Sequence, residues 1–239
     1  MDIFKYLNTE INNIIDDGYI NYNEYENIIF TDGACNKKEI NGVKPGGFSI
    51  YIDKSNINTI NKLKLYKKIN NINFMYKNNK FEYKVTNIRA EGYAILYTMI
   101  IYKTILIDKK KFNVNNLNNY ILNEKELINI KINNNKIKNK NILIITDCEF
   151  WINVITKWST NWYIKDIIYE KKNIDLILYM IYYYNILLDN NINIEFQHVK
   201  SHAEKKKNIF CSYAEYGNIE ADKLAVLAKS LNDYNFYIY

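Results

Sequence analysis

Two short apolar runs, each ending in an aspartate, constrain the fold of this sequence more than any other feature. The first is Asn27-Ile-Ile-Phe-Thr-Asp32, and the second is Asn141-Ile-Leu-Ile-Ile-Thr-Asp147. Runs of this length and composition predict buried strands that end at a turn. Two buried strands that both end in an acid can place their carboxylates at one edge of a sheet.

Apolar patterns elsewhere predict the remaining elements. The spacing of Ala90, Ala94, Tyr97, Ile101 and Ile105 is helical. Other patterns predict a hairpin partner for the first run at 46–52, a third strand at 81–85, a helix at 174–188 and a strand at 192–199. The last helix is predicted to begin with Asn218 as its N-cap and to carry Asp222 in its first turn. This order predicts an α/β fold, a mixed sheet covered by helices.

The chain of 239 residues is long enough for one domain with embellishments. We expect that domain at 27–231, after an N-terminal extension at 1–26 and before a C-terminal tail at 232–239. The extension is predicted to be a short helix near 4–15 or a loose arm. An Asn-, Lys- and Ile-rich stretch near 108–140 is predicted to be a low-complexity insertion.

Charge and cysteine usage favour a soluble intracellular protein of the cytoplasm or nucleus, which we expect to be a monomer. The net charge of +6 suits a polyanionic partner, although lysine supplied by A/T-rich coding would give the same charge. Cys35, Cys148 and Cys211 are odd in number and widely spaced, which favours a reducing compartment. We find no secretory signal and no apolar stretch of about 18 residues, so no membrane partner is expected.

Four acids in the predicted elements, Asp32, Glu91, Asp147 and Asp222, indicate a metal site for phosphate chemistry. Clustered carboxylates repel one another unless cations neutralise them. Hard oxygen ligands with room for water suit Mg²⁺. Two such ions can activate a water and stabilise the leaving oxygen of an in-line displacement, which suits hydrolysis of a phosphodiester.

Five ordered segments resemble the motifs of type 1 ribonuclease H, and together they cover roughly residues 27–231. They are Phe30-Thr-Asp-Gly-Ala-Cys35, Thr86-Asn-Ile-Arg-Ala-Glu91, Ile145-Thr-Asp-Cys-Glu-Phe150, Val199-Lys-Ser-His202 and Asn218-Ile-Glu-Ala-Asp222. The resemblance implies a mixed five-stranded sheet, with three antiparallel strands, then two parallel ones, and helices on both faces. It also implies an endoribonuclease that hydrolyses the RNA strand of RNA/DNA hybrids with two Mg²⁺ ions, or Mn²⁺, and leaves 5′-phosphate and 3′-hydroxyl ends.

The resemblance assigns roles to individual residues. Asp32 would bind both ions, Glu91 and Asp147 would complete the ion on the leaving-group side, and Asp222 would hold the ion that activates water. His202 would assist proton transfer or product release, as a side chain that titrates near neutral pH can. His198, inside the last predicted strand, is expected to be structural.

Substrate contacts follow from the same resemblance. Gly33, Ala34 and Cys35 would approach the RNA strand through backbone groups, and Asn87 would read a 2′-hydroxyl or simply cap its helix. Glu149 stands where relatives place an amide, and the added charge can weaken a contact.

The stretch at 155–162 resembles the segment with which the family grips the DNA strand. Its two tryptophans would contribute there, or they form a core stripe. We expect Trp158 to point inward, toward the core, and Trp162 to point outward.

Other interpretations remain open at this stage. Two other nuclease branches of the fold are disfavoured. Proofreading exonucleases carry Asp-x-Glu on the first strand, whereas this chain has Asp32-Gly-Ala, and integrase relatives end with a catalytic Glu, whereas the last acid here is Asp222. A non-catalytic or partner-dependent hybrid-binding module of the same fold stays an alternative. The reaction would serve primer removal in DNA replication or hybrid clearance in transcription, and the sequence identifies no partner in either process.

Overall fold

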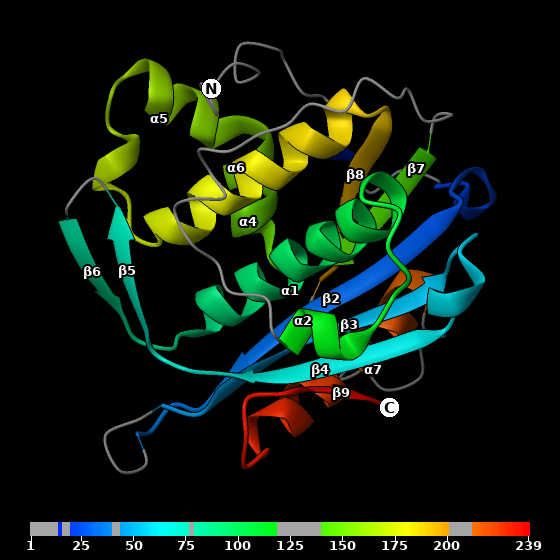
Figure 1. Ribbon diagram of the computed structural model, residues 1–239, viewed down its shortest axis with the longest axis horizontal. Coiled ribbons are helices and arrows are strands. Elements are labelled where there is room, and N and C mark those ends of the chain that lie inside the picture. The colour runs from blue at the N-terminus through cyan, green and yellow to red at the C-terminus, as the bar shows by residue number, and fades with distance from the viewer. Residues whose placement is uncertain (1–13, 16–19, 40–43, 77–78, 119–139, 201–211) are drawn as a thin grey trace.

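A mixed seven-stranded sheet lies at the centre of the chain, with helices on both faces (Figure 1). This computed structural model describes residues 14–15, 20–39, 44–76, 79–118, 140–200 and 212–239. The strand order is β1-β8-β7-β2-β3-β4-β9. The strands are β1 (Ile14–Ile15), β2 (Asn27–Cys35), β3 (Gly46–Lys54), β4 (Leu63–Ile69), β7 (Lys140–Thr146), β8 (Ile192–His198) and β9 (Phe236–Ile238).

The predicted arrangement of three antiparallel strands followed by two parallel ones is confirmed. β2, β3 and β4 pair antiparallel, and β7 and β8 run parallel to β2. The predicted third strand at 81–85 is wrong, because β4 occupies that place and residues up to 83 belong to a separate hairpin. That hairpin consists of β5 (Ile72–Tyr76) and β6 (Asn79–Tyr83). Lysines at positions 64, 67 and 68 obscure the alternation of β4 in the sequence.

The count of five strands is also corrected, because a short strand extends each edge of the sheet. β1 pairs in parallel with β8, so Ile14–Ile15 form a strand where the expected helix would end, and residues 4–13 of that expected helix lie outside the described residues. β9 pairs antiparallel with β4, so the expected C-terminal tail joins the sheet. Part of the expected insertion contributes to the core, since Leu117 on α2 (Val114–Asn118) is buried. Residues 119–139 of the insertion lie outside the described residues.

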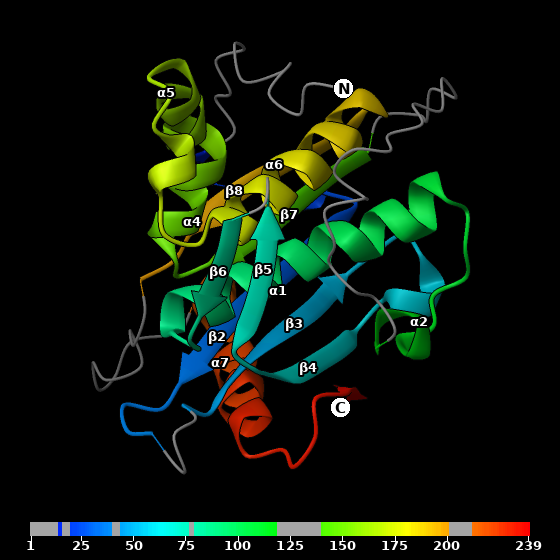
Figure 2. The ribbon, with the colours of Figure 1, turned by 60° about the vertical axis from the view of Figure 1, so that its left-hand side comes forward.

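The helices divide between the two faces of the sheet (Figures 1 and 2). One face carries α1 (Asn87–Tyr102), its π-helical continuation at Lys103–Ile107, and α6 (Ile174–Asp189), while α7 (Tyr213–Lys229) packs on the other. The shorter segments are α4 (Glu149–Asn153), a π-helical turn (Val154–Trp158), α5 (Ser159–Ile164) and 3-10 turns at Tyr22–Glu24, Asn58–Ile60 and Ile168–Glu170.

Strand alternation separates two hydrophobic cores across the sheet. Ile29, Phe48 and Ile50 pack with α1 and α6, whereas Phe30 and Ile145 pack against α7. The helical segment Asn87–Ile107 is long and apolar enough to cross a membrane, but 72% of its most apolar window is buried inside the protein. Its contacts with the sheet and α6 identify it as a core helix.

The start of the last helix was predicted wrongly. α7 begins at Tyr213, after a capping box in which Ser212 and Glu215 exchange side-chain-to-backbone hydrogen bonds. Asn218 therefore lies inside the helix, and Asp222 lies near its middle. The Ser-x-x-Glu pattern at 212–215 was the available signal in the sequence.

A buried ion pair joins the first turn of α1 to the first turn of α6, two residues before Glu91. The Arg89 guanidinium donates to both carboxylate oxygens of Asp175, at 2.9 and 2.6 Å. Its side chain also donates to Asn173 and Tyr93 and lies over the Tyr83 ring. Because both charges are almost fully buried, each depends on the other for compensation.

Arg89→Ala should lower the free energy of unfolding by about 3–5 kcal/mol, since it leaves the Asp175 carboxylate buried without its cation. Urea unfolding followed by circular dichroism measures the change. Lys80→Ala is the matched control, because Lys80 and Glu82 form an exposed pair whose loss should cost less than about 1 kcal/mol. Equal losses for the two variants would contradict the assigned importance of the buried pair.

Candidate active site

Asp32 and Asp147 lie on neighbouring strands, as the sequence predicts. β2 and β7 are parallel neighbours, and each aspartate directly follows the last residue pair between them, Thr31 with Thr146. The predicted end of the first strand at Asp32 is wrong, because β2 continues to Cys35 through its pairing with β3. Asp32 is only 4% exposed, and its Oδ1 accepts a 2.6 Å hydrogen bond from the Gly33 backbone N–H. The bond fixes the orientation of one carboxylate in the site.

Glu91 reaches the same point from α1. The helix begins after Thr86, whose hydroxyl accepts from the Arg89 N–H. Gly33 lies so close to the helix that a Cβ at this position would be 2.2 Å from the Glu91 backbone nitrogen. The missing side chain thus allows the strand and the helix to touch. Three carboxylate oxygens lie within 4.8 Å of one another, one from each of Asp32, Glu91 and Asp147.

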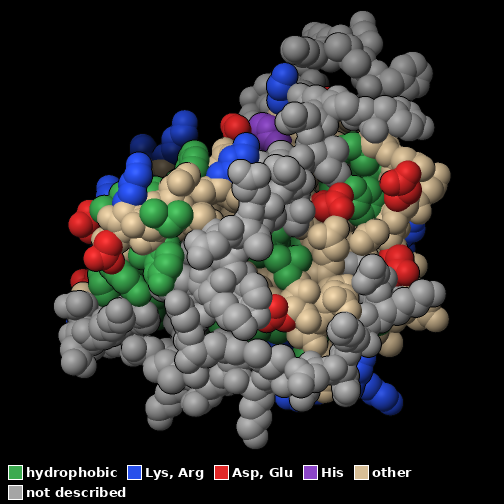
Figure 3. Space-filling view, turned by 90° about the horizontal axis from the view of Figure 1, so that it is seen from above, with side chains coloured by type: hydrophobic (Ala, Val, Ile, Leu, Met, Phe, Trp, Pro, Cys, Tyr) green, Lys and Arg blue, Asp and Glu red, His purple; other side chains and the backbone are tan. Residues whose placement is uncertain are grey.

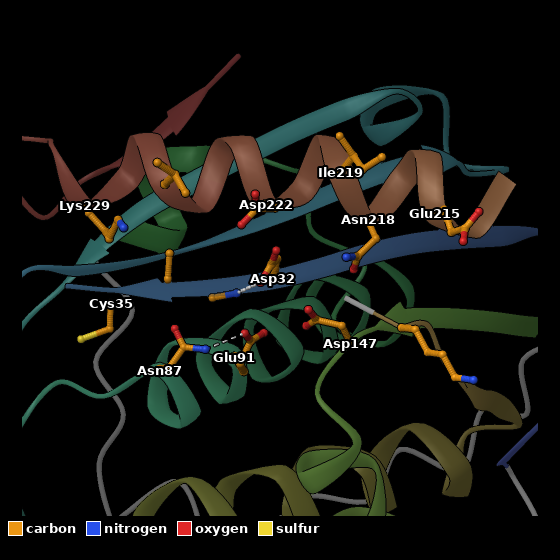
Figure 4. A pocket seen from close by; sticks show the side chains of 14 residues that line it. Asp32, Cys35, Asn87, Glu91, Asp147, Glu215, Asn218, Ile219, Asp222 and Lys229 are labelled. Carbon is orange, nitrogen blue, oxygen red and sulfur yellow. Dashed lines mark hydrogen bonds between the residues drawn. The ribbon is translucent and has the colours of Figure 1, made fainter. Parts of the chain in front are cut away.

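Asp222 faces this cluster from α7, on the other side of the pocket (Figure 4). The helix is held at this level by Ser49, which lies opposite Asp32 on β3. The buried Ser49 hydroxyl donates a 2.7 Å hydrogen bond to the carbonyl of Ala221, the residue before Asp222. Two strands and two helices therefore supply the four acids to one pocket.

Burial and mutual repulsion destabilise the charged forms of these acids. Burial raises the pKa of Asp32 well above its ordinary value, and the charges of Asp147 and Asp222 raise it further. Burial likewise raises the pKa of Glu91, with added repulsion from Asp32 and Asp147. Glu91 Oε2 is buried without a hydrogen-bond partner among the described residues. A buried carboxylate oxygen without a hydrogen-bond partner, beside two more carboxylates, provides oxygen ligands that suit a hard divalent cation.

The pocket has a volume of about 230 Å³, and its lining contains residues that sequence reasoning missed. The lining residues are Asp32, Gly33, Ala34, Cys35, Asn87, Glu91, Asp147, Lys200, Glu215, Asn218, Ile219, Asp222, Val226 and Lys229. Apart from Ile219, the α7 members recur at intervals of three and four along one face of the helix, so a correct prediction of the helix start would have identified that face from Asp222. Asn218 is 7% exposed, and its Oδ1 has no partner among the described residues.

Four of the expected substrate-contact residues line this pocket. Gly33, Ala34 and Cys35 form its wall after Asp32, and Asn87 lies beside Glu91, with 3.4 Å between Asn87 Nδ2 and Glu91 Oε1. Cys35 and Cys148 are both free thiols, and Cys211 lies outside the described residues.

The other three expected contacts lie outside the pocket, on α4 and the turns after it. Glu149 is exposed at the start of α4. Trp158 is 36% exposed and packs edge-on against Phe150, whereas Trp162 is half-buried against the core. The predicted orientations of the two tryptophans are therefore wrong, because the π-helical turn at Val154–Trp158 changes the helical phase.

The two histidines differ in what can be said of them. His202 lies outside the described residues. His198 Nε2 lies 3.2 Å from the backbone carbonyl oxygen of Asp147, at the end of the paired strands β7 and β8. The contact agrees with the structural role expected for His198.

Comparison with known proteins identifies the family. The family model described as RNase H matches residues 87–230. The chain belongs to the RNase H family. The match includes three of the four acids of this RNase H pocket and all of α7. No curated protein matches the chain.

Solved structures agree with the RNase H fold. The chain is similar to LC9-RNase H1, described as a type 1 RNase H with the type 2 active-site motif, with a TM-score of 0.51 and 13% identity, covering 89% of this chain and 77% of that one. It is also similar to the native protease-reverse transcriptase of prototype foamy virus, with a TM-score of 0.51 and 15% identity, covering 90% of this chain but 22% of that one. At these identities the likeness concerns the fold alone.

Asp32→Asn should raise the thermal stability of the metal-free protein at neutral pH, because the amide removes one buried charge from a repelling cluster. Since the folded-state pKa of Asp32 is raised, the stability that its protonated form confers at low pH is lost as pH rises through that pKa. Mg²⁺ should raise the melting temperature of the unaltered protein and have little effect on the variant.

Thermal unfolding with Mg²⁺ or with chelator, from pH 5 to pH 8, measures both effects. Glu149→Gln is the control, because Glu149 is an exposed acid outside the pocket. A metal-free Asp32→Asn protein less stable than the original at pH 8 would contradict the repulsion.

Proposed function

We propose that this chain is an endoribonuclease that hydrolyses the RNA strand of RNA/DNA hybrids and leaves 5′-phosphate and 3′-hydroxyl ends. The observation that carries the proposal is the convergence of Asp32, Glu91, Asp147 and Asp222 into one pocket, in a chain of the RNase H family. No acid of the expected set is missing or turned away, which disfavours a module that binds hybrids without cutting them.

The pocket residues fit divalent cations, and we propose Mg²⁺, with Mn²⁺ as a substitute. Asp32, Glu91 and Asp147 would hold a cation among their clustered oxygens, and Asp222 would supply a carboxylate from the opposite wall. The buried, unpartnered Glu91 Oε2 supports this assignment, because such an acceptor is costly unless something binds it. Bound divalent cations supply an activated water and stabilise the leaving oxygen.

The chain's own residues orient the reaction around these acids. The Gly33 N–H fixes Asp32, and the Ser49 hydroxyl fixes α7 beside Asp222. The Asn218 Oδ1, one helical turn before Asp222, offers an acceptor that can orient a water in the pocket. Asn87 offers a donor at the mouth, where it can contact a ribose 2′-hydroxyl. We retain the proposal that His202 assists proton transfer.

A second surface is suited to the DNA strand of the hybrid. It comprises Phe150, Trp158, Trp162, Lys157 and Lys171. Lys157 is exposed, and the Lys171 ammonium lies 5.2 Å from the centre of the Trp162 ring. On the left-hand side of Figure 3, where Figure 1 places α5, lysine and hydrophobic side chains lie side by side with acidic ones between them. Because α4 begins two residues after Asp147, this surface starts next to the pocket.

The decisive assay incubates the protein with matched RNA/DNA, RNA/RNA and DNA/DNA duplexes, with Mg²⁺ or with chelator. We expect metal-dependent cleavage confined to the RNA of the hybrid. Asp32→Asn is the matched inactive variant and should lower turnover by at least about 100-fold. Tight hybrid binding without cleavage would favour a binding module, and cleavage of DNA would place the chain in another branch of the fold.

Trp158→Ala should raise KM for the hybrid about tenfold and leave kcat and the melting temperature nearly unchanged. Loss of one aromatic contact to a nucleic-acid strand costs about 1–3 kcal/mol. Steady-state kinetics with Tyr216→Ala as control tests this, because Tyr216 is an exposed aromatic on α7 outside the pocket lining. An unchanged KM would show that Trp158 does not contact the DNA strand.

A further inference from the structure

A lysine lies at one end of the acidic pocket, on the same face of α7 as Asp222. The pocket-facing stripe of α7 consists of Glu215, Asn218, Asp222, Val226 and Lys229. Lys229 follows Asp222 by seven residues, which places it about 10 Å further along the helix axis. Figure 4 shows Lys229 at the end of the pocket that also contains Cys35. The pocket is thus negative at its centre and positive at this end.

Close packing of α7 on β3 fixes the position of Lys229. A Cβ at Gly47 would lie 2.4 Å from the Ala228 Cβ and 2.9 Å from the Lys229 backbone nitrogen. Gly47 pairs with Ala34, two residues beyond Asp32 on β2. The backbone of Lys229 therefore lies over the segment that we expect to face the RNA strand. Its location follows from a rigid helix-to-sheet contact.

Lys229 lacks the carboxylate partner that its neighbours have. Lys64 and Lys223 each bind Glu220 at 2.8 Å, whereas no acid lies within salt-bridge distance of the half-buried Lys229 among the described residues. Lys44 lies outside the pocket lining but close in the fold to Cys35, because it precedes Pro45 and Gly46, whose backbones pair with Asn36 and Cys35. Burial raises the pKa of the Cys35 thiol, and the charges of Lys44 and Lys229 oppose that rise. Two ammonium groups thus lie near Cys35, and an anion between them would complete the charge balance.

We propose that Lys229, with Lys44 beside it, binds a backbone phosphate of the RNA strand at a distance from the scissile phosphate and so sets the register of the substrate in the pocket. The inference rests on the proposed function and adds a contact to it. A phosphate is the anion that a bound nucleic-acid strand presents on either side of the cleavage point. Three acids at the centre exclude an anion there unless cations are bound, whereas the Lys229 end attracts one.

A structural role for Lys229 predicts a different outcome. A lysine in the last turn of a helix stabilises the helix through the macrodipole, by about 0.3–1 kcal/mol. In that case Lys229→Gln would lower the melting temperature slightly and leave KM and its salt dependence unchanged.

Steady-state kinetics of Lys229→Gln at several salt concentrations separates the two roles. We expect KM for the hybrid to rise about tenfold at moderate salt, as for loss of one charge-assisted contact, with kcat changed less than twofold. The slope of log KM against log salt should fall by about 0.7–0.9, the contribution of one phosphate. Lys223→Gln, on the same helix and paired with Glu220, should leave both quantities unchanged. An unchanged slope in Lys229→Gln would overturn the proposal.

Neutral phosphate analogues locate the contact. A series of hybrids carries one methylphosphonate at each RNA position on either side of the cleavage point. At a single position the effects of the analogue and of Lys229→Gln on KM should not be additive, because either change removes the same contact. Full additivity at every position would overturn the proposal. Failure of the unaltered protein to cleave any hybrid would instead refute the proposed function, so the two failures are distinguishable.

Discussion

The contact between Gly33 and the backbone of α1 is the constraint on which the site depends. A side chain at this position would meet the Glu91 nitrogen, so the strand and the helix could not touch. Without that contact Glu91 would not reach Asp32 on β2 and Asp147 after β7. On the opposite face two residues of β3 hold α7 against the sheet. Gly47 allows close packing, and Ser49 donates a hydrogen bond to the helix backbone. The pocket is thus a consequence of two helices that approach one sheet from both sides.

The resulting cluster opposes folding in the absence of a cation. Asp32 and Glu91 are buried, and burial raises the pKa of both. The charges of Asp147 and Asp222 raise the pKa of Asp32 further, and those of Asp32 and Asp147 raise that of Glu91. One oxygen of Glu91 has no partner among the described residues. The rest of the fold offsets this cost. The Arg89–Asp175 pair ties the beginning of α1 to α6, and apolar cores on both faces of the sheet hold the strands that carry the aspartates.

The parts of this architecture that depend on local pattern were predictable from the sequence. The buried strands β2 and β7 have a clear apolar signature before Asp32 and Asp147, and the helix from Asn87 has a clear period. The continuation of β2 beyond Asp32 depends on its pairing with β3, which the local pattern does not reveal. β4 was missed because three lysines in Leu63–Ile69 interrupt the apolar pattern, although Leu65, Tyr66 and Ile69 of this strand are buried. The orientations of Trp158 and Trp162 could not be derived, since a π-helical turn shifts the phase after Val154. Lys229 could have been found only after the capping box at Ser212 placed the start of α7 correctly.

The most direct test of the account is a crystal structure of the protein grown with Mn²⁺, with the ions located by anomalous scattering. The account predicts a cation bound by oxygens of Asp32, Glu91 and Asp147, and further cation density on the Asp222 side when a hybrid is bound to an inactive variant. A pocket in which the carboxylates share protons or bind a lysine, with no anomalous density at neutral pH and millimolar Mn²⁺, would contradict it.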